Sequence, residues 1–151
     1  LPVHKQPPKA GGDYPLVMTC GHTRWSVHTL WRDVDILLRL QRGEPVIFVN
    51  PDDAGQRGLV DHDHAAVHND LGEFIARVKL TPGIQPGQVH IYHAWLATQH
   101  VGGHASDAIT PSPARVTNFA GRHGHLVNEV GWLDLSGNDR DTRVDLRKYT
   151  A

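Results

Sequence analysis

Reactive side chains are concentrated between residues 19 and 29, where the sequence is TCGHTRWSVHT. A thiol, two imidazoles, a guanidinium and an indole fall within this short stretch. Residues of these types support three kinds of chemistry. His22 and His28 offer nitrogen ligands for a metal, Cys20 or Ser26 offers a nucleophile, and the donors together suit a polar, anionic ligand.

Metal binding is the first interpretation, because the chain has twelve histidines against one cysteine. Four further pairs have spacings found in metal sites: His62/His64, His90/His93, His100/His104 and His123/His125. Zinc requires three or four converging ligands, and residues three apart in a strand do not share a face. Because such pairs recur by chance in a histidine-rich sequence, surface or loop histidines are favoured, and no metal ligand is predicted.

Nucleophilic catalysis is the second interpretation. Ser26 lacks the strained Gly-x-Ser-x-Gly turn that activates a serine in hydrolases. Cys20 has His22 two positions away, but catalytic partners are usually brought together by the fold and not by adjacency in sequence. A small, partly buried thiol at the end of a strand is therefore favoured, and no catalytic residue is predicted.

A ligand-binding loop is the third interpretation and fits best. A strand that ends in TCG and turns into HTRWS exposes consecutive backbone N–H groups, and Gly21 permits close approach of a ligand. Arg24 can clamp a phosphate or a ring carbonyl with two hydrogen bonds, and Trp25 offers a flat apolar wall. This array suits a large heterocycle that carries phosphates.

A second loop, TNFAGRHGHLVN (117–128), has related chemistry. Asn118 can offer a donor and an acceptor to the edge of a heterocycle, with glycines and Arg122 close by in sequence. A glycine-rich surface turn is the alternative, and the residues alone leave both interpretations open.

Length and composition indicate one globular domain. The chain has 151 residues, 39% of them hydrophobic and 21% charged, and its net charge of −1 provides no global field for nucleic acid or anionic membranes. A single cysteine excludes an internal disulfide and a cysteine-rich zinc or iron–sulfur site. Residues 1–13, rich in proline and glycine, are predicted to be a linker from an upstream region, followed by one domain over residues 14–151.

Short strands separated by turns must position these loops. Strands are predicted at 14–19, 45–49, 88–95 and 142–149, and two more within 64–81 around a turn at Asn69–Gly72, with alternation of buried and exposed side chains over 74–80. A helix is predicted over 29–43, closing on Gly43, and a short one after the N-cap Asn50 and Pro51, ending at Gly58. Residues 96–113 are aperiodic and predict a long loop. The pattern favours a β-barrel with inserted helices.

Several motifs resemble a known family in order and spacing: PLVMTCGHTRWSVHT, VIFVNPDDAGQRGLVDHD and GEFIARVKLTPGIQPGQV. They are similar to the C-terminal molybdopterin-dinucleotide-binding domain of the dimethyl sulfoxide reductase family. IYHAW, NFAGRHGHL and DRDTRVDLRKY look most like alpha subunits of its nitrate reductase, selenate reductase and ethylbenzene dehydrogenase branch. The resemblance covers about residues 14–149.

The resemblance implies a mainly β fold with short helices, a six-stranded double-psi β-barrel of the aspartate-decarboxylase-like type. It implies that the domain binds molybdopterin guanine dinucleotide, two copies of which hold molybdenum, with the protein ligand of the metal outside this chain. The implied cofactor contacts are Cys20, Gly21, His22, Thr23, Arg24, Trp25, Ser26, His28, Asn118, Phe119 and Gly121.

The resemblance also carries a departure and a set of expected partners. The family's Asp-Gly-Asp turn is Asp-His-Asp here, so we expect His62 to take the left-handed conformation with some strain.

The expected partners are the remaining domains of a parent catalytic subunit and an iron–sulfur electron-transfer subunit, on the periplasmic or cytoplasmic side of a bacterial membrane. Neither nucleic acid binding nor direct membrane insertion is expected.

Two alternatives to this function stay open. The chain could be a stand-alone, histidine-rich metal-binding or hydrolytic β-barrel. It could also be a structural cap whose residues 20–28 never touch the cofactor.

Overall fold

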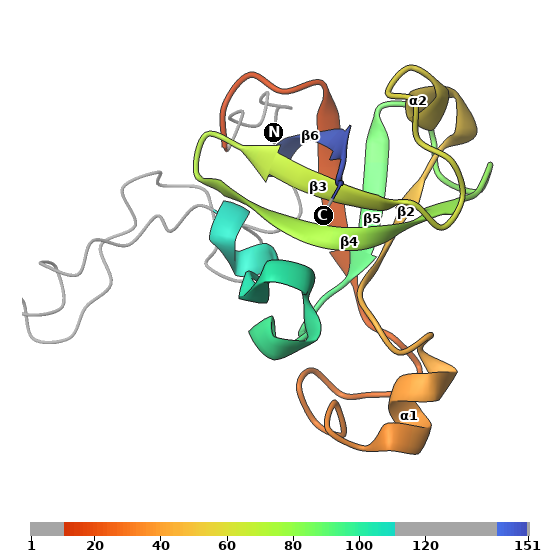
Figure 1. Cartoon of the computed structure of the whole chain (residues 1–151), viewed down its shortest axis with the longest axis vertical. Coiled ribbons are helices and arrows are strands. Elements are labelled where there is room, and N and C mark those ends of the chain that lie inside the picture. The colour runs from red at the N-terminus through yellow and green to blue at the C-terminus, as the bar shows by residue number, and fades with distance from the viewer. Residues whose placement is uncertain (1–10, 111–141, 151) are drawn as a thin grey trace, which may run out of the picture.

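A computed structural model describes residues 11–110 and 142–150, and the elements below lie within them (Figure 1). The strands are β1 (Leu16–Gly21), β2 (Val46–Val49), β3 (His64–Asn69), β4 (Gly72–Leu80), β5 (Gln88–Tyr92) and β6 (Thr142–Lys148). The helices are α1 (Asp35–Leu40), α2 (Pro51–Gly55) and the 3₁₀ turns η1 (Ala97–Gln99), η2 (Val101–Gly103) and η3 (Ser106–Ile109). In these residues no helix is both long and apolar enough to cross a bilayer.

The six strands form a closed, mixed barrel in the order β1-β5-β2-β4-β3-β6. Two of the pairings, β1 with β5 and β2 with β4, are parallel, and the other four are antiparallel. Closure leaves no strand without a neighbour on either side. The predicted six-stranded barrel with short helices is thus confirmed.

The barrel interior holds the hydrophobic core, because alternate residues of each strand point inward. Among its fully buried side chains are Leu16, Met18, Ile47, Val67, Phe74, Val89, Ile91 and Val144. The alternation predicted over 74–80 is correct for Phe74, Ala76 and Val78, but Ile75, expected on the outer side, is also buried. η2 and η3 pack against β4, the strand that carries Ile75.

Helix α2 forms as the sequence predicts. The Asn50 side chain accepts a hydrogen bond from the Asp52 N–H at 2.9 Å, and Pro51 occupies the first turn, where its missing N–H is not needed. The Asn50 amide also donates to the Ile84 carbonyl at 2.7 Å, which ties the helix start to the turn before β5. The helix itself ends at Gly55, before the predicted Gly58.

The predicted helix over 29–43 is largely wrong, because only Asp35–Leu40 is helical. Trp31 has a φ of 66°, which no helix accommodates, and Leu30 is 59% exposed. The apolar side chains whose spacing suggested a long helix do not pack on the barrel core within the described residues. The C-terminal end is as predicted: Gly43 has a φ of 78°, and its N–H donates to the Leu38 carbonyl at 2.7 Å.

The Asp-His-Asp turn has the predicted strained geometry. His62 has a φ of 73°, and its N–H donates to the Val78 carbonyl at 3.0 Å. Asp61 accepts from Lys79 and from the Leu80 N–H, and these hydrogen bonds hold the pKa of its carboxyl below the ordinary value. The turn is therefore anchored on both sides of the left-handed residue.

The long loop predicted at 96–113 contains three short 3₁₀ turns within its described part, residues 96–110. The proposed linker, residues 1–13, and the second loop, 117–128, fall largely or wholly outside the described residues. The division into linker and domain at residue 14 stays a prediction.

Candidate functional site

Parallel pairing of β1 with β5 brings two distant histidines together. The register places Gly21 opposite Tyr92, and the His93 N–H donates to the Gly21 carbonyl at 3.1 Å. Because both strands run in the same direction, His22 and His93 leave the barrel at the same end. This end of the barrel is where the candidate site is built.

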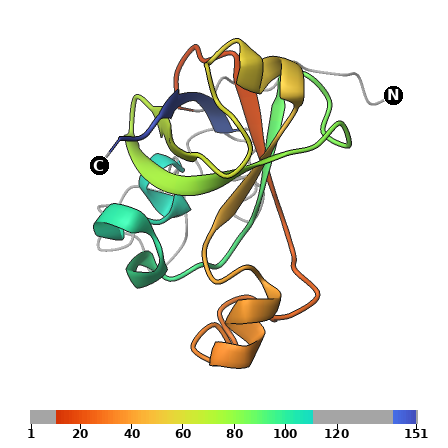
Figure 2. The ribbon, with the colours of Figure 1, turned by 45° about the vertical axis from the view of Figure 1, so that its right-hand side comes forward.

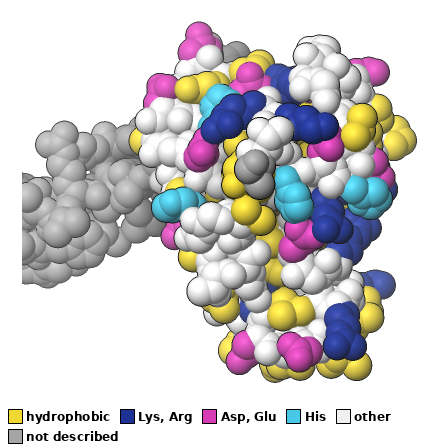
Figure 3. All heavy atoms as spheres, viewed as in Figure 1, with side chains coloured by type: hydrophobic (Ala, Val, Ile, Leu, Met, Phe, Trp, Pro, Cys, Tyr) yellow, Lys and Arg dark blue, Asp and Glu magenta, His cyan; other side chains and the backbone are white. Residues whose placement is uncertain are grey.

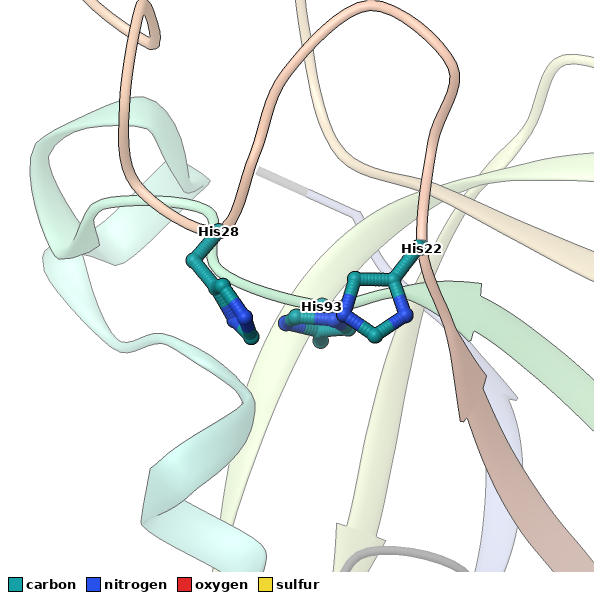
Figure 4. A group of neighbouring side chains, drawn as sticks. All are labelled: His22, His28 and His93. Carbon is teal, nitrogen blue, oxygen red and sulfur yellow. The ribbon is translucent and has the colours of Figure 1, made fainter.

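His28 completes a cluster with these two side chains (Figure 4). The ring centres of His22 and His93 are 4.4 Å apart, those of His22 and His28 4.9 Å, and those of His28 and His93 5.0 Å. One ring nitrogen from each residue lies within 4.8 Å of the other two. His28 has a φ of 51°, so its backbone turns back toward the barrel at this residue. The sequence spacing grouped His93 only with His90, so its proximity to His22 and His28 was not predicted.

The chain between β1 and β2, called the 22–45 segment here, leaves and re-enters the barrel at this end. Both views show it projecting from the barrel (Figures 1 and 2). A pocket of about 410 Å³ lies where the segment meets the barrel. It is lined by His22, Thr23, Arg24, Trp25, Leu40, Gln41, Arg42, Val46, Phe48, Tyr92 and Trp95.

The pocket combines cations with aromatic walls. The guanidinium of Arg24 lies 5.7 Å from the ring centre of Trp25, and that of Arg42 lies 5.7 Å from the ring centre of Phe48. The described residues that line it include these two arginines and no carboxylate. The local charge therefore favours an anionic ligand, although the chain as a whole is nearly neutral.

A buried arginine fixes the 22–45 segment against the barrel. Arg32 is 1% exposed, donates to the Gln41 side chain and, at 2.8 Å, to the His93 carbonyl, and lies 4.2 Å from the ring centre of Trp95. The Gln99 side chain donates to the Arg32 carbonyl at 2.6 Å. Burial lowers the pKa of Arg32, although a guanidinium stays protonated at neutral pH.

Three buried polar atoms at this end of the barrel have no hydrogen-bond partner among the described residues. They are the Ser26 hydroxyl, in a residue 5% exposed, the Trp95 indole N–H, in a residue 8% exposed, and Nε of Arg32. Burying such a group without a partner costs about 1–3 kcal/mol. Unsatisfied donors beside a pocket are consistent with a site completed by a ligand.

Gly21 and Cys20 face barrel neighbours. A Cβ at Gly21 would lie 2.8 Å from two ring atoms of His90, so glycine is required for that imidazole to pack. Burial lowers the pKa of His90, whose Nδ1 is 2.9 Å from the Thr19 hydroxyl. Cys20 packs against the barrel core, which agrees with a structural thiol.

The predicted site residues thus divide into four groups. His22, Thr23, Arg24 and Trp25 line the pocket, whereas Ser26 and His28 lie in the same loop and Cys20 and Gly21 end β1. Asn118, Phe119 and Gly121 lie outside the described residues, so their proximity to this loop stays a prediction. Five further residues at this end of the barrel were not predicted from the sequence, because only strand register and the path of the 22–45 segment bring them here: Arg32, Arg42, Tyr92, His93 and Trp95.

Residues 16–129 match the family model of the molydopterin dinucleotide binding domain, named for its molybdopterin ligand. The chain belongs to this family. The domain is of the kind found in alpha subunits of dimethyl sulfoxide reductase-type molybdoenzymes, as the sequence motifs predicted.

Two relatives illustrate the match. The chain is 37% identical to the respiratory nitrate reductase subunit alpha of Haloferax mediterranei, over 98% of this chain and 16% of that protein. It is 36% identical to the perchlorate reductase subunit alpha of Dechloromonas aromatica, over 99% of this chain and 16% of the relative. The chain therefore spans about a sixth of these relatives' length.

The fold also has a counterpart among solved structures. Acetylene hydratase from Pelobacter acetylenicus superposes with a TM-score of 0.64, covering 91% of this chain and 19% of that chain at 17% identity. At this identity the likeness concerns the barrel alone.

Proposed function

We propose that this domain holds molybdopterin guanine dinucleotide within a larger molybdenum oxidoreductase, with the pocket at the end of β1 and β5 contacting the cofactor. The observation that carries the proposal is the pairing of Arg24 and Arg42 with aromatic walls in one pocket. Cations beside flat apolar surfaces suit a ligand with ring systems and phosphates.

The described residues fit such a group. A volume of about 410 Å³ lies within the range of small-molecule and cofactor pockets, and can admit part of a dinucleotide. The Ser26 hydroxyl and the Trp95 N–H, which have no hydrogen-bond partner among the described residues, can bond to a ligand. His22 and His28 are exposed and add donors or acceptors to the edge of a heterocycle.

The work of this chain is binding and orientation. When bound, the dinucleotide supplies the molybdenum at which the larger enzyme's redox chemistry takes place, with the protein ligand of the metal in another domain. Arg24 and Arg42 neutralise phosphate charge, and Trp25 and Tyr92 provide surfaces for ring packing. Arg32 does not line the pocket, and acts by holding the 22–45 segment in position.

The 22–45 segment is proposed to contact the remaining domains of the parent catalytic subunit. It exposes large apolar side chains, with Leu30 at 59%, Trp31 at 51% and Ile36 at 68%. Figure 3 shows hydrophobic atoms on the lobe that this segment forms below the barrel. Apolar surface of this extent on one lobe is typical of an interaction site. An iron–sulfur electron-transfer subunit is proposed as a further partner of the parent enzyme.

The test measures cofactor content in the full-length parent enzyme carrying Arg24→Ala or His28→Asn. Asparagine is chosen at His28 because it tolerates the positive φ of that position. After gel filtration, the dinucleotide content of each variant is expected to be lower than that of the wild type by at least about tenfold. Losing one charge-assisted hydrogen bond weakens binding by about this factor. Released guanine nucleotide and molybdenum are quantified separately.

Arg39→Ala is the matched control, since Arg39 is exposed on α1 and lies outside the pocket lining. It is expected to leave both contents unchanged. Full cofactor occupancy and unchanged activity in the Arg24 and His28 variants would contradict the proposed contacts, and would favour the domain as a structural cap.

A further inference from the structure

The three histidines at the end of β1 and β5 form a cluster that cofactor binding alone does not require. Each belongs to a different part of the chain path: His22 follows β1, His28 lies in the turn of the 22–45 segment that the Leu30 N–H to Val27 carbonyl bond closes, and His93 follows β5. Figure 4 shows the rings converging on one point between the loop and the strand end. One ring nitrogen from each of the three lies within 4.8 Å of the other two.

We propose that, in the absence of the cofactor, these three imidazoles bind one divalent cation of the zinc type. Imidazole nitrogen suits Zn²⁺, Co²⁺, Ni²⁺ and Cu²⁺, and three histidines leave the fourth position of a tetrahedral ion to water. His22 and His28 are exposed, so the ion reaches the site from solvent and its charge stays in contact with water.

The geometry requires a modest closure of the cluster. Two nitrogens bound to one tetrahedral zinc ion at about 2.0–2.1 Å lie about 3.4 Å apart, so the rings must approach by up to roughly 1.4 Å. Side-chain rotations of the two exposed histidines supply this movement. The third ligand is the fixed one, because the His93 backbone is held by hydrogen bonds to Gly21 and Arg32.

The ion would fasten the 22–45 segment to the end of β5. His22 and His28 bracket the loop that carries Arg24 and Ser26, so a bound cation would order that loop before the cofactor arrives. His22 and His28 are also proposed cofactor contacts, so the cation and the dinucleotide compete for them. The metal site itself does not depend on the proposed function and is tested without the cofactor.

The first experiment titrates Co²⁺ into the 151-residue chain after it has been stripped with a chelator. The expected result is the visible d–d absorption of a four-coordinate ion, saturating at one equivalent at the tight site and displaced by Zn²⁺. Zn²⁺ is also expected to raise the unfolding temperature, because the ion binds the folded state. Absence of a stoichiometric cobalt spectrum overturns the proposal.

Variants assign the site. His22→Gln, His28→Asn and His93→Ala are each expected to weaken Co²⁺ binding at least about tenfold, the scale of metal-site losses. His104→Gln and His62→Asn are the controls, since both residues are exposed and lie outside the cluster, and asparagine tolerates the positive φ of position 62. Equal affinity in wild type and in all three cluster variants overturns the proposal, as does a loss confined to a control.

A second measurement keeps the assignment independent of whether a variant folds. Long-range ¹H–¹⁵N spectra of the histidine rings in the wild-type chain are recorded with and without one equivalent of Zn²⁺. The ring signals of His22, His28 and His93 are expected to shift together. A shift of other histidine rings, with these three unmoved, places the ion elsewhere and overturns the proposal.

Discussion

The guanidinium of Arg32 lies 4.2 Å from the centre of the Trp95 ring and donates to the carbonyl of His93 at 2.8 Å. One buried side chain therefore joins the 22–45 segment to the strand end that carries a histidine of the cluster. Among the described residues its side chain donates to the neutral acceptors Gln41 and His93, so these acceptors and the Trp95 ring stabilise the charge of the guanidinium.

Arg32→Lys is expected to loosen the 22–45 segment without unfolding the barrel. A lysine ammonium cannot reproduce the planar stack on Trp95 together with two separate hydrogen bonds. We expect the free energy of local opening to fall by about 2 kcal/mol. Amide hydrogen exchange at Leu38 and Gly43 should then be roughly 30-fold faster, because the open form is more populated by that factor. Arg39→Lys on the exposed face of α1 is the control. Faster exchange throughout the strands would show instead that Arg32 supports the whole barrel.

Ser26→Ala is expected to affect stability and cofactor retention in opposite directions. The Ser26 hydroxyl is buried without a described partner, so its removal from the cofactor-free chain should raise the free energy of unfolding by up to about 1 kcal/mol. In the parent enzyme the same change should lower cofactor content. Thr23→Val is the comparison, because the Thr23 hydroxyl accepts from the Trp25 N–H and its loss should destabilise. Urea unfolding measures the stability of both variants in the cofactor-free chain. A destabilised Ser26 variant would contradict the hypothesis.

Substitutions at His62 should follow the demands of a left-handed backbone. His62→Val is expected to lower the free energy of unfolding by about 1–2 kcal/mol, because a β-branched residue resists a φ of 73°. His62→Gly should be at least as stable as wild type, since glycine has no Cβ to strain. The exposed contact of His62 with Asp61, at 3.4 Å, contributes little. His104→Val, at an extended φ of −111°, should change stability little, and equal losses at both positions would disprove the argument.

His100 should make the fold sensitive to acid. Its side chain is buried, with Nδ1 3.0 Å from the Ile75 carbonyl and the ring 5.5 Å from that of Phe74. Burial lowers the pKa of His100 below its ordinary value of 6.5, against the opposing effects of Ile75 and Asp107. The unfolded chain therefore takes up a proton first as the pH falls below 6.5, and the free energy of unfolding decreases.

His100→Asn removes this titration and retains a donor for the Ile75 carbonyl. Between about pH 7.5 and about pH 5.5, the variant should lose less stability than wild type in urea unfolding. His104→Asn, at an exposed position, should lose as much stability as wild type. An equal loss in the His100 variant would show that other groups control the acid response.

Local signals in the sequence were sufficient where backbone chemistry decides structure. Asn50 followed by Pro51 predicted the start of α2, and Gly43 predicted the end of α1. The left-handed φ of His62 was expected from the resemblance, because the family has a glycine at this turn. The same signals could not locate the start of α1. Leu30 and Val34 have helical spacing, but Trp31 takes a left-handed conformation and the apolar face lies outside the barrel core.

The motifs in the sequence determined the family, the cofactor class and the candidate loop at 19–29, and residues 16–129 match that family. Only the tertiary structure decided which residues join that loop. Parallel pairing of β1 with β5 places His93 beside His22, and the fold buries Arg32 against Trp95. The physical reason is that turns and caps depend on neighbours in sequence, whereas register and burial depend on strands that meet only after the barrel closes.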